Sequence, residues 1–268
     1  MKQLRTFIVV ALALLICGNA YGWGRLCHRT IAEIAERNLT PKAKANIERY
    51  TKGTPLADYS LFLDEVAKQE PYKTEFRGWH ASIANPNCKS PQSVRDEHRK
   101  GRDGVTAMNY FTELLKEREK LSDSTVLNAI KCIVHIIPDY HCPVHVRYTD
   151  CNNSGKFDVT FFGKRTQYHK VWDSGVAGRG RKLKPAQYKA YADMLNTLSP
   201  KQQRKITKGW AQEWFEAAAR DVRPTIKTVK EGDILDQKWV DSQLPFGEDL
   251  MQKAGYRLAK ALNTLFDK

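Results

Sequence analysis

The stretch "SDSTVLNAIKCIVHIIPDYHCPVH" (residues 122–145) holds a long helical pattern that ends in a group of polar side chains. Ser122 or Asp123 is a suitable N-cap, and apolar residues continue the pattern to about position 139. Pro138 lies inside the pattern, where its missing N–H should end or kink the helix. The stretch therefore predicts a core helix that breaks at its polar end.

The polar end of this helix is rich in groups that bind metal ions. His135 and Asp139 are four residues apart, a spacing that places both side chains on one helix face, about 5–6 Å apart. His145 follows the expected break and should approach from another direction. A helix end where polar side chains meet water is the plainer interpretation. We apply it to His141, which we expect to be exposed.

Residues of the same kind recur along the chain. His169 and Asp173 repeat the four-residue spacing, and His28 and His80 stand elsewhere in the sequence. Asp64 lies inside the apolar pattern "YSLFLDEVAK", where a carboxylate is costly unless it is paired, hydrogen-bonded or bound to metal. Any one pair is as simply explained by a hydrogen bond. Imidazole nitrogen together with carboxylate oxygen suits zinc, and the whole ordered set favours a zinc site.

The first 22 residues have the anatomy of a secretory signal peptide. A basic start precedes an apolar run over residues 7–17, and Ala20 and Gly22 are the small residues expected before a cut at Trp23. The alternative is an uncleaved anchor, but the apolar run is shorter than the 20 or so residues that span a membrane. We therefore predict a secreted or periplasmic protein.

The predicted mature chain, residues 23–268, reads as one domain, because no repeat or flexible linker divides it. It carries 42 basic and 30 acidic residues, since the leader holds two of the 44 basic residues and no acid, so its formal charge is +12. A basic exported protein suits an anionic partner such as nucleic acid, a phosphorylated substrate or an acidic membrane surface. We expect a monomer without a transmembrane segment after processing.

Helical patterns dominate this domain. The segment "KFDVTFFGKRTQYH" (156–169) differs, because it alternates and carries a Gly-Lys turn typical of a small hairpin. Two segments read as loops, 85–93 and the strongly basic 175–185. The predicted fold is all-α, a multi-helix single domain with one small β-hairpin. Beside residues 123–139, helices are expected over 29–37, a segment led by Thr40 and Pro41, 54–69, 103–120 led by Asp103, 185–198, 199–221 and 246–267.

Five cysteines remain after the predicted cleavage. Export permits disulfide bonds, which we expect here, although an odd number leaves at least one thiol unpaired. Cys27 stands beside His28, where a thiol is either a stray zinc ligand or a disulfide partner.

From Trp23 onward, the candidate ligands follow a recognisable order. Trp-Gly-x-x-x-His opens it at 23–28, Asp64 and His80 follow, and H-x-x-x-D-x-x-x-P-x-H (135–145) and H-x-x-W-D (169–173) complete it. This order resembles that of the secreted single-strand-specific zinc nucleases, the fungal S-one/P-one type and the plant bifunctional nucleases. Those families are relatives of the bacterial zinc phospholipases C. The resemblance covers about 150 residues.

The resemblance implies a helical fold around a cluster of three zinc ions. One zinc would be held by Asp64, His80, His135 and Asp139. A second would be held by the free amine and carbonyl of Trp23, by His28 and by Asp139 as a bridge. The third would be held by His145, His169 and Asp173. The implied activity is hydrolysis of single-stranded DNA and RNA to 5′-phosphate products, with 3′-nucleotidase activity.

Two features depart from the family's pattern. Family members often carry a basic residue three positions after the aspartate matching Asp64, but Ala67 stands there. Lys68 is one residue further on and would face a similar direction on a helix, so Asp64 and Lys68 are our candidate catalytic residues. The family's base-binding aromatic and acid are replaced by Ala81 and Ile83, so base recognition is expected to be weaker, relocated or lost.

Two other functions share part of this pattern. A zinc phospholipase C would use the same cluster on a lipid headgroup ester, and it would want exposed apolar or aromatic residues around the cleft. A non-enzymatic metal-binding protein is the third alternative, but the complete set of ligands argues against it. The basic charge and the "HKVWD" segment favour a nuclease.

Overall fold

The computed structural model describes residues 23–99 and 103–267. The predicted signal peptide, residues 1–22, lies outside the described residues. Within them, every helix is too short or too polar to serve as a membrane span.

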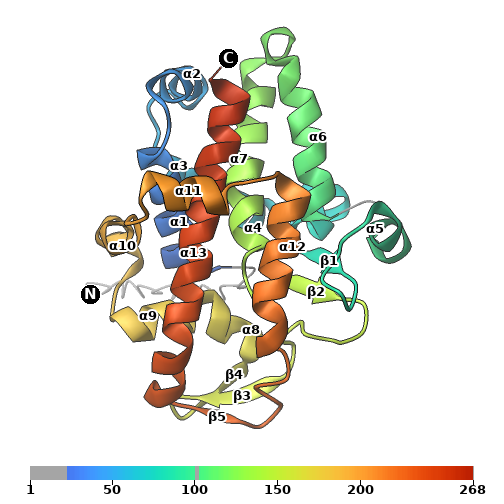
Figure 1. Ribbon diagram of the computed structural model, residues 1–268, viewed down its shortest axis with the longest axis vertical. Coiled ribbons are helices and arrows are strands. Elements are labelled where there is room, and N and C mark those ends of the chain that lie inside the picture. Colours follow the sequence, from blue (N-terminus) through green and yellow to red (C-terminus); the bar gives the residue numbers. More distant parts are fainter. Residues whose placement is uncertain (1–22, 100–102, 268) are drawn as a thin grey trace, which may run out of the picture.

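Three long helices form the frame of the molecule: α1 (Arg25–Arg37), α7 (Asp123–Asp139) and α13 (Gln237–Phe266). Figure 1 shows α7 and α13 running along the long axis, and all three helices pack against one another. The apolar face of α7 is fully enclosed, with Val126, Ile130, Ile133 and Ile137 showing no exposed surface. The frame thus holds the polar end of α7 inside the protein, against the first turns of α1.

Shorter helices surround this frame, and several begin at the caps that the sequence predicts. Side chains of Thr40, Asp103 and Ser122 each accept a hydrogen bond from the backbone N–H three residues later, at 3.1, 2.8 and 3.2 Å. The other α-helices are α2 (Pro41–Thr51), α3 (Leu56–Tyr59), α4 (Phe62–Val66), α5 (Gln92–Arg99), α6 (Gly104–Lys116), α8 (Tyr168–Lys170), α9 (Val176–Arg181), α10 (Tyr188–Leu195), α11 (Pro200–Ile206) and α12 (Ala211–Val222). The 3₁₀ and π segments are η1 (Tyr72–Phe76), η2 (Arg77–His80), η3 (Arg118–Lys120), η4 (Val171–Gly175), η5 (Pro185–Gln187) and η6 (Arg223–Thr225).

Four segments differ from the sequence-based prediction. Residues 54–69 form two short helices instead of one, and residues 199–221 are divided by a turn that contains Gly209, with φ of +89°. The expected basic loop 175–185 contains α9, and α13 begins at Gln237, well before the expected 246. In that last case Asp236 supplies the cap, accepting from the Trp239 N–H at 3.0 Å.

The predicted end of α7 is confirmed. The helix continues through Pro138 and stops one residue later, at Asp139. Because proline lacks the N–H but keeps its carbonyl, the turn after it closes by a bond from His141 N–H to the Pro138 carbonyl, at 3.0 Å. The chain then reverses into residues that lead to a second segment of the site.

The predicted hairpin is also confirmed, as β3 (Asp158–Phe161) and β4 (Lys164–Gln167). Its turn is Phe162-Gly163, one residue earlier than expected, with φ of +50° and +75° at the two positions. A short strand β5 (Ile234–Leu235) pairs in parallel with β3. A second sheet was not predicted: β1 (Ser82–Ala84) pairs in parallel with β2 (Val146–Tyr148), which joins the segment after His80 to the segment after His145.

The expected disulfide bonds are not found in the described part of the chain, where every cysteine has a free thiol. Cys27, Cys132 and Cys142 are almost completely buried in the hydrophobic core, where they act as small apolar side chains. They lie on core-facing positions of helices and turns, so their contribution is to the packing of the core.

We predict opposite effects for two glycine substitutions in α13. A Cβ at Gly255 would lie 2.6 Å from Ile34 Cγ2 of α1, whereas a Cβ at Gly247 would meet Trp172 at an ordinary 3.5 Å. Gly255→Ala should therefore lower the free energy of unfolding by about 1–3 kcal/mol through overpacking. Gly247→Ala should raise it by up to about 1 kcal/mol, because alanine favours the helix. Urea denaturation of both variants, at equal zinc concentration, tests the pair; equal effects would contradict close packing at the α1–α13 crossing.

Candidate metal centre

Eight histidine and aspartate side chains converge at the buried end of α7. His28 comes from α1, Asp64 from α4 and His80 from the end of η2, while His145 precedes β2 and His169 and Asp173 come from α8 and η4. The structure thus brings together all the His and Asp residues of the predicted ligand set. Their donor atoms form three groups, each within 4.8 Å: His28, His135 and Asp139; Asp64, His80 and His135; and His145, His169 and Asp173.

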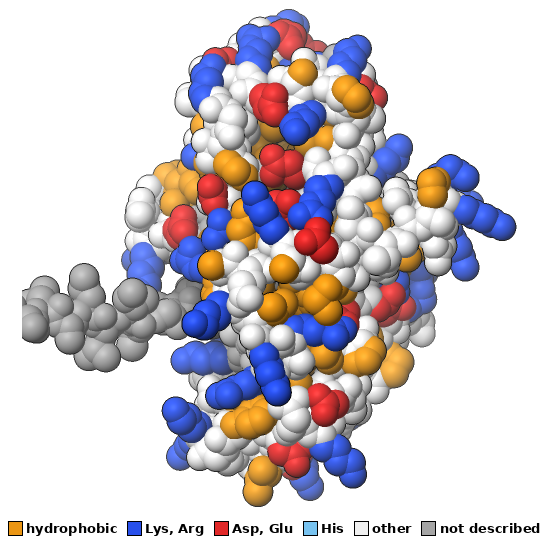
Figure 2. Space-filling view, turned by 90° about the vertical axis from the view of Figure 1, so that its left-hand side faces the viewer, with side chains coloured by type: hydrophobic (Ala, Val, Ile, Leu, Met, Phe, Trp, Pro, Cys, Tyr) orange, Lys and Arg blue, Asp and Glu red, His pale blue; other side chains and the backbone are white. Residues whose placement is uncertain are grey.

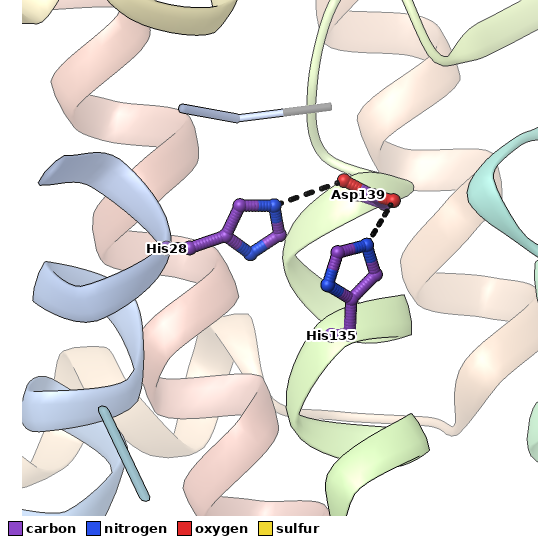
Figure 3. A group of neighbouring side chains, drawn as sticks. All are labelled: His28, His135 and Asp139. Carbon is purple, nitrogen blue, oxygen red and sulfur yellow. Dashed lines mark ion pairs between the residues drawn. The ribbon is translucent and has the colours of Figure 1, made fainter. Parts of the chain in front are cut away.

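Asp139 joins the first two groups. Its Oδ2 lies 2.9 Å from His80 Nδ1 and 3.0 Å from His135 Nε2, and its Oδ1 lies 3.3 Å from His28 Nε2. Figure 3 shows one oxygen of the Asp139 carboxylate facing His28 of α1 and the other facing His135 of α7. Its two oxygens therefore point to different histidines, as a bridging carboxylate requires.

Backbone carbonyls fix which ring nitrogen of His135 faces the centre. His135 Nδ1 donates to the Ser60 carbonyl at 2.8 Å, so in the neutral ring the Nε2 lone pair points inward. That Nε2 lies 3.1 Å from His80 Nδ1 and 3.7 Å from Asp64 Oδ1. The break between α3 and α4 at Ser60 is what turns this carbonyl toward the ring.

The third group is arranged in the same way. His169 Nδ1 donates to the Ser154 carbonyl at 2.7 Å, and His145 Nδ1 donates to the His80 carbonyl. Their Nε2 atoms then face each other as two acceptors only 3.1 Å apart. Two lone pairs at this distance repel unless a cation lies beside them. In a tetrahedral zinc site with bonds of about 2.1 Å, ligand nitrogens are separated by roughly 3.4 Å, so the donors fit zinc.

Several buried polar atoms in the centre make no hydrogen bond within the described residues. They include both nitrogens of His28, both oxygens of Asp173 and Oδ1 of Asp139, in side chains with no exposed surface. Each such atom costs about 1–3 kcal/mol if it has no partner. Metal ions would give partners to these carboxylate oxygens and to the lone pair of the His28 ring at the same time.

The pKa values show which forms the protein favours. Burial, helped by the charge of His135, lowers the pKa of His28 to about 4, and burial lowers the pKa of His169 to about 4. Both rings are thus neutral near pH 7, the form that binds metal. Burial opposes protonation of His135 as well, but the Asp139 and Asp64 carboxylates outweigh it and raise its pKa to about 9.

The carboxyl groups respond in opposite directions. Burial raises the pKa of Asp173 well above its usual value, and burial does the same for Asp64. For Asp139 burial acts in that direction too, but His135 and His145 outweigh it and hold its pKa well below the usual value. Asp139 is therefore the carboxylate most firmly ionised among its imidazole neighbours.

The backbone of residues 23–24 lies beside the third group. Gly24 N–H donates to the Asp173 carbonyl, and a Cβ at Gly24 would collide with the backbone of Asp173 and with Ser174 Oγ. Trp23 is 1% exposed, and its ring meets Trp172 edge-on at 6.4 Å between centroids. Only glycine permits this approach, which brings the start of the predicted mature chain to the centre.

The other singled-out residues lie in less central places. α4 ends at Val66, so Lys68 is an exposed residue of the following turn. The expectation that Ala67 and Lys68 face a similar direction on one helix therefore does not apply. Ala81 and Ile83 are 5% and 6% exposed, at the end of η2 and within β1. Neither offers a ring or a charge to a base.

The expectation for His141 is wrong. Its side chain has no exposed surface: Nδ1 donates to the Ile137 carbonyl at 2.8 Å, and Nε2 accepts from the buried Arg257 at 2.6 Å. The pair ties the turn after α7 to α13. Cys27 is fully buried and burial raises its pKa, so it stays a thiol and belongs to none of the three groups.

Comparison with known proteins agrees with this geometry. The S1/P1 Nuclease family model matches residues 23–267. Nuclease S1 of Aspergillus oryzae is 29% identical over 97% of this chain and 98% of its own length. Endonuclease 2 of Arabidopsis thaliana is 25% identical, covering 97% and 96% of the two chains, and Nuclease P1 of Penicillium citrinum is 26% identical, covering 91% and 97%. With its three groups of histidines and aspartates around Asp139, the chain belongs to the S1/P1 nuclease family.

Proposed function

We propose that this nuclease uses three zinc ions to hydrolyse phosphodiester bonds of single-stranded DNA and RNA, leaves 5′-phosphate ends, and also acts as a 3′-nucleotidase. The observation that carries the proposal is the pair of facing acceptors in the third group, His145 and His169, whose Nε2 atoms are 3.1 Å apart. Together with the bridging position of Asp139, it calls for several cations in one small volume.

Each zinc would have its own set of protein ligands. Zinc supplies Lewis acidity, which makes water nucleophilic near neutral pH and stabilises negative charge on phosphoryl oxygens. The first ion would be held by Asp64, His80, His135 and Asp139, the second by Trp23, His28 and Asp139, and the third by His145, His169 and Asp173.

The partly exposed ligands define where a substrate would approach. The side chains of Asp64, His80 and His169 are 16%, 12% and 11% exposed, while those of His28, His135 and Asp139 are completely buried. Among these buried ligands, His135 is held in place by its hydrogen bond to the Ser60 carbonyl. The scissile phosphate would meet the edge that the three exposed ligands form, which a flexible single strand reaches more readily than a duplex.

A basic groove next to the third group supports nucleic acid as the partner. A cavity of about 650 Å³ is lined by Lys170, Arg179 and Lys182 together with Phe161 and Phe162. The Arg179 guanidinium lies 4.7 Å from the centre of the Phe162 ring. Figure 2 shows the side of the molecule that lies on the left in Figure 1, and in its lower part Lys and Arg side chains are interleaved with hydrophobic ones. Cations for phosphates beside rings for bases are the usual features of a single-strand surface.

The same proposal includes export and processing. The apolar leader ends at Gly22, and the family model's match begins at Trp23. Cleavage there would release the α-amino group that the second zinc needs. We infer a signal peptide over residues 1–22, a secreted or periplasmic nuclease domain over 23–268, and a monomeric enzyme.

Removing zinc should abolish cleavage. Treating protein that starts at Trp23 with a chelator should stop cleavage of a single-stranded oligonucleotide and lower the melting temperature, because the unpaired acceptors of the centre lose their partners. Zinc should restore both, and magnesium should not. Product ends are identified by mass spectrometry. Full cleavage in the chelated protein, or products with 3′-phosphates, would contradict the proposal, and phosphatidylcholine hydrolysis in place of cleavage would favour the phospholipase alternative.

Adding one residue before Trp23 should weaken the second zinc site. The extension converts the free amine into an amide, which is a poor zinc ligand, so we expect less zinc per chain by elemental analysis and a rate at least tenfold lower. The matched control carries one extra residue after Lys268. An extended protein with unchanged zinc content and rate would exclude the amine as a ligand.

Lys68 is tested as the cation that replaces the family's basic residue. If it stabilises the transition state, Lys68→Ala should lower kcat at least tenfold with little change in KM, and Lys68→Arg should retain most of the rate. Lys201→Ala, at an exposed lysine of α11, is the control. Wild-type kcat in Lys68→Ala would remove Lys68 from the catalytic residues.

A further inference from the structure

A continuous chain of aromatic rings runs past the metal centre. It starts at Phe62 on α4, continues through Tyr72 and Phe76 of η1 to Trp79 of η2, and ends at Tyr110 of α6. Successive ring centroids are separated by 5.4, 5.0, 4.2 and 6.5 Å. Two of these rings neighbour metal-binding residues in the sequence, since Phe62 is two residues before Asp64 and Trp79 directly precedes His80.

Four of these rings, those of Tyr72, Phe76, Trp79 and Tyr110, form one side of a pocket of about 520 Å³ between η1, η2, α6 and α7. Among the described residues that line it, none carries a charged side chain, and Thr106, Thr125 and Asn128 add hydroxyl and amide groups to the two tyrosine hydroxyls. Tyr110 stands at the rim and is 54% exposed, which is unusual for a large aromatic side chain in this protein. The pocket therefore offers ring faces and a few neutral hydrogen-bonding groups.

The pocket lies close to the metal centre along α7. Cys132 lines it, and His135 is three residues further along the helix, about 4.5 Å in axial distance. It is separate from the positions of Ala81 and Ile83, which are buried in or next to the β1–β2 sheet. A strand bound at the centre would reach the pocket within one or two nucleotides.

The lining selects among occupants. An acyl chain would fit aliphatic walls, and a quaternary ammonium group would gain from an acid among the aromatics, but the described lining is rich in aromatic rings and holds no acid. A heteroaromatic base can stack on the rings and use the amide and hydroxyl groups along its edge.

Nearby cations fit the backbone of a strand. Lys131 Nζ lies 5.0 Å from the Phe62 ring centre and 5.1 Å from that of Tyr59, and Lys73 is an exposed residue of η1. Neither lysine forms an ion pair within residues 23–99 and 103–267. They are available to phosphates of a strand whose base is held in the pocket.

We propose that this pocket binds a nucleobase of the substrate strand, stacked against Tyr110 and the neighbouring rings. The inference rests on the proposed nuclease function. It gives a place for base recognition in a chain that has Ala81 and Ile83 at the family's base-binding positions. The base sits beside the centre on the η1–α6 side, and its phosphate enters the edge formed by Asp64 and His80.

The test combines Tyr110 variants with strands that lack one base. Zinc-loaded protein is given oligothymidine hexamers, either complete or with one abasic position moved along the strand. One abasic position should raise the KM of the wild type roughly tenfold, the loss expected for one stacked base. Tyr110→Ala should raise the KM for the complete strand by a similar factor. The KM of this variant should then be the same for the complete strand and for the strand with that abasic position. Tyr110→Phe should behave as wild type, and so should Met194→Ala, at an exposed apolar side chain of α10.

Cross-linking locates the base independently of the rate. A hexamer with 5-iodouracil at the sensitive position should cross-link, on irradiation, to a peptide from residues 71–80, 104–116 or 125–132. Cross-links confined to other segments, or Tyr110→Ala that keeps wild-type KM and full sensitivity to the abasic position, overturn the pocket while leaving the nuclease intact. A wild type that cuts no hexamer overturns the proposed function itself.

Discussion

The carboxylate of Asp139, at the last residue of α7, is the constraint on which the rest of the centre depends. It contacts three histidines from three different elements, at 2.9 to 3.3 Å, and has no exposed surface. A buried carboxylate is tolerated only where positive charge or hydrogen bonds compensate it. α1, α7 and η2 must therefore meet at this point, and the position of each is fixed by the need to bring its histidine there.

The protein trades stability for this arrangement. Acceptors face acceptors in the third group, and several buried oxygens and nitrogens lack protein partners. In compensation, the surroundings are tightly packed: the α1–α13 crossing has no room for a methyl group at Gly255, and Gly24 lies against the backbone of Asp173. Dense packing of the frame holds side chains together that would otherwise repel one another.

The sequence predicts which His and Asp side chains come together, because their residue types and short spacings can be recognised within single segments of the chain. The four-residue spacings, the caps of α2, α6 and α7 and the end of α7 at Pro138 all follow from single segments. The β1–β2 pairing, the break at Ser60 and the burial of His141 against Arg257 depend on contacts between distant segments, and no periodicity in one segment reveals them. The aromatic pocket was missed for the same reason, since its rings come from α6 as well as from η1 and η2.

The pairing of β1 with β2 also has a consequence for how the protein folds. It joins residues 82–84 to residues 146–148 in parallel, and the His145 ring donates to the carbonyl of His80 across the same junction. Such contacts have a high contact order and form late, after the loop between them has been closed. The complete set of donors therefore does not exist in a partly folded chain. A metal ion that needs all of these donors would therefore bind a nearly finished structure and could not nucleate the fold.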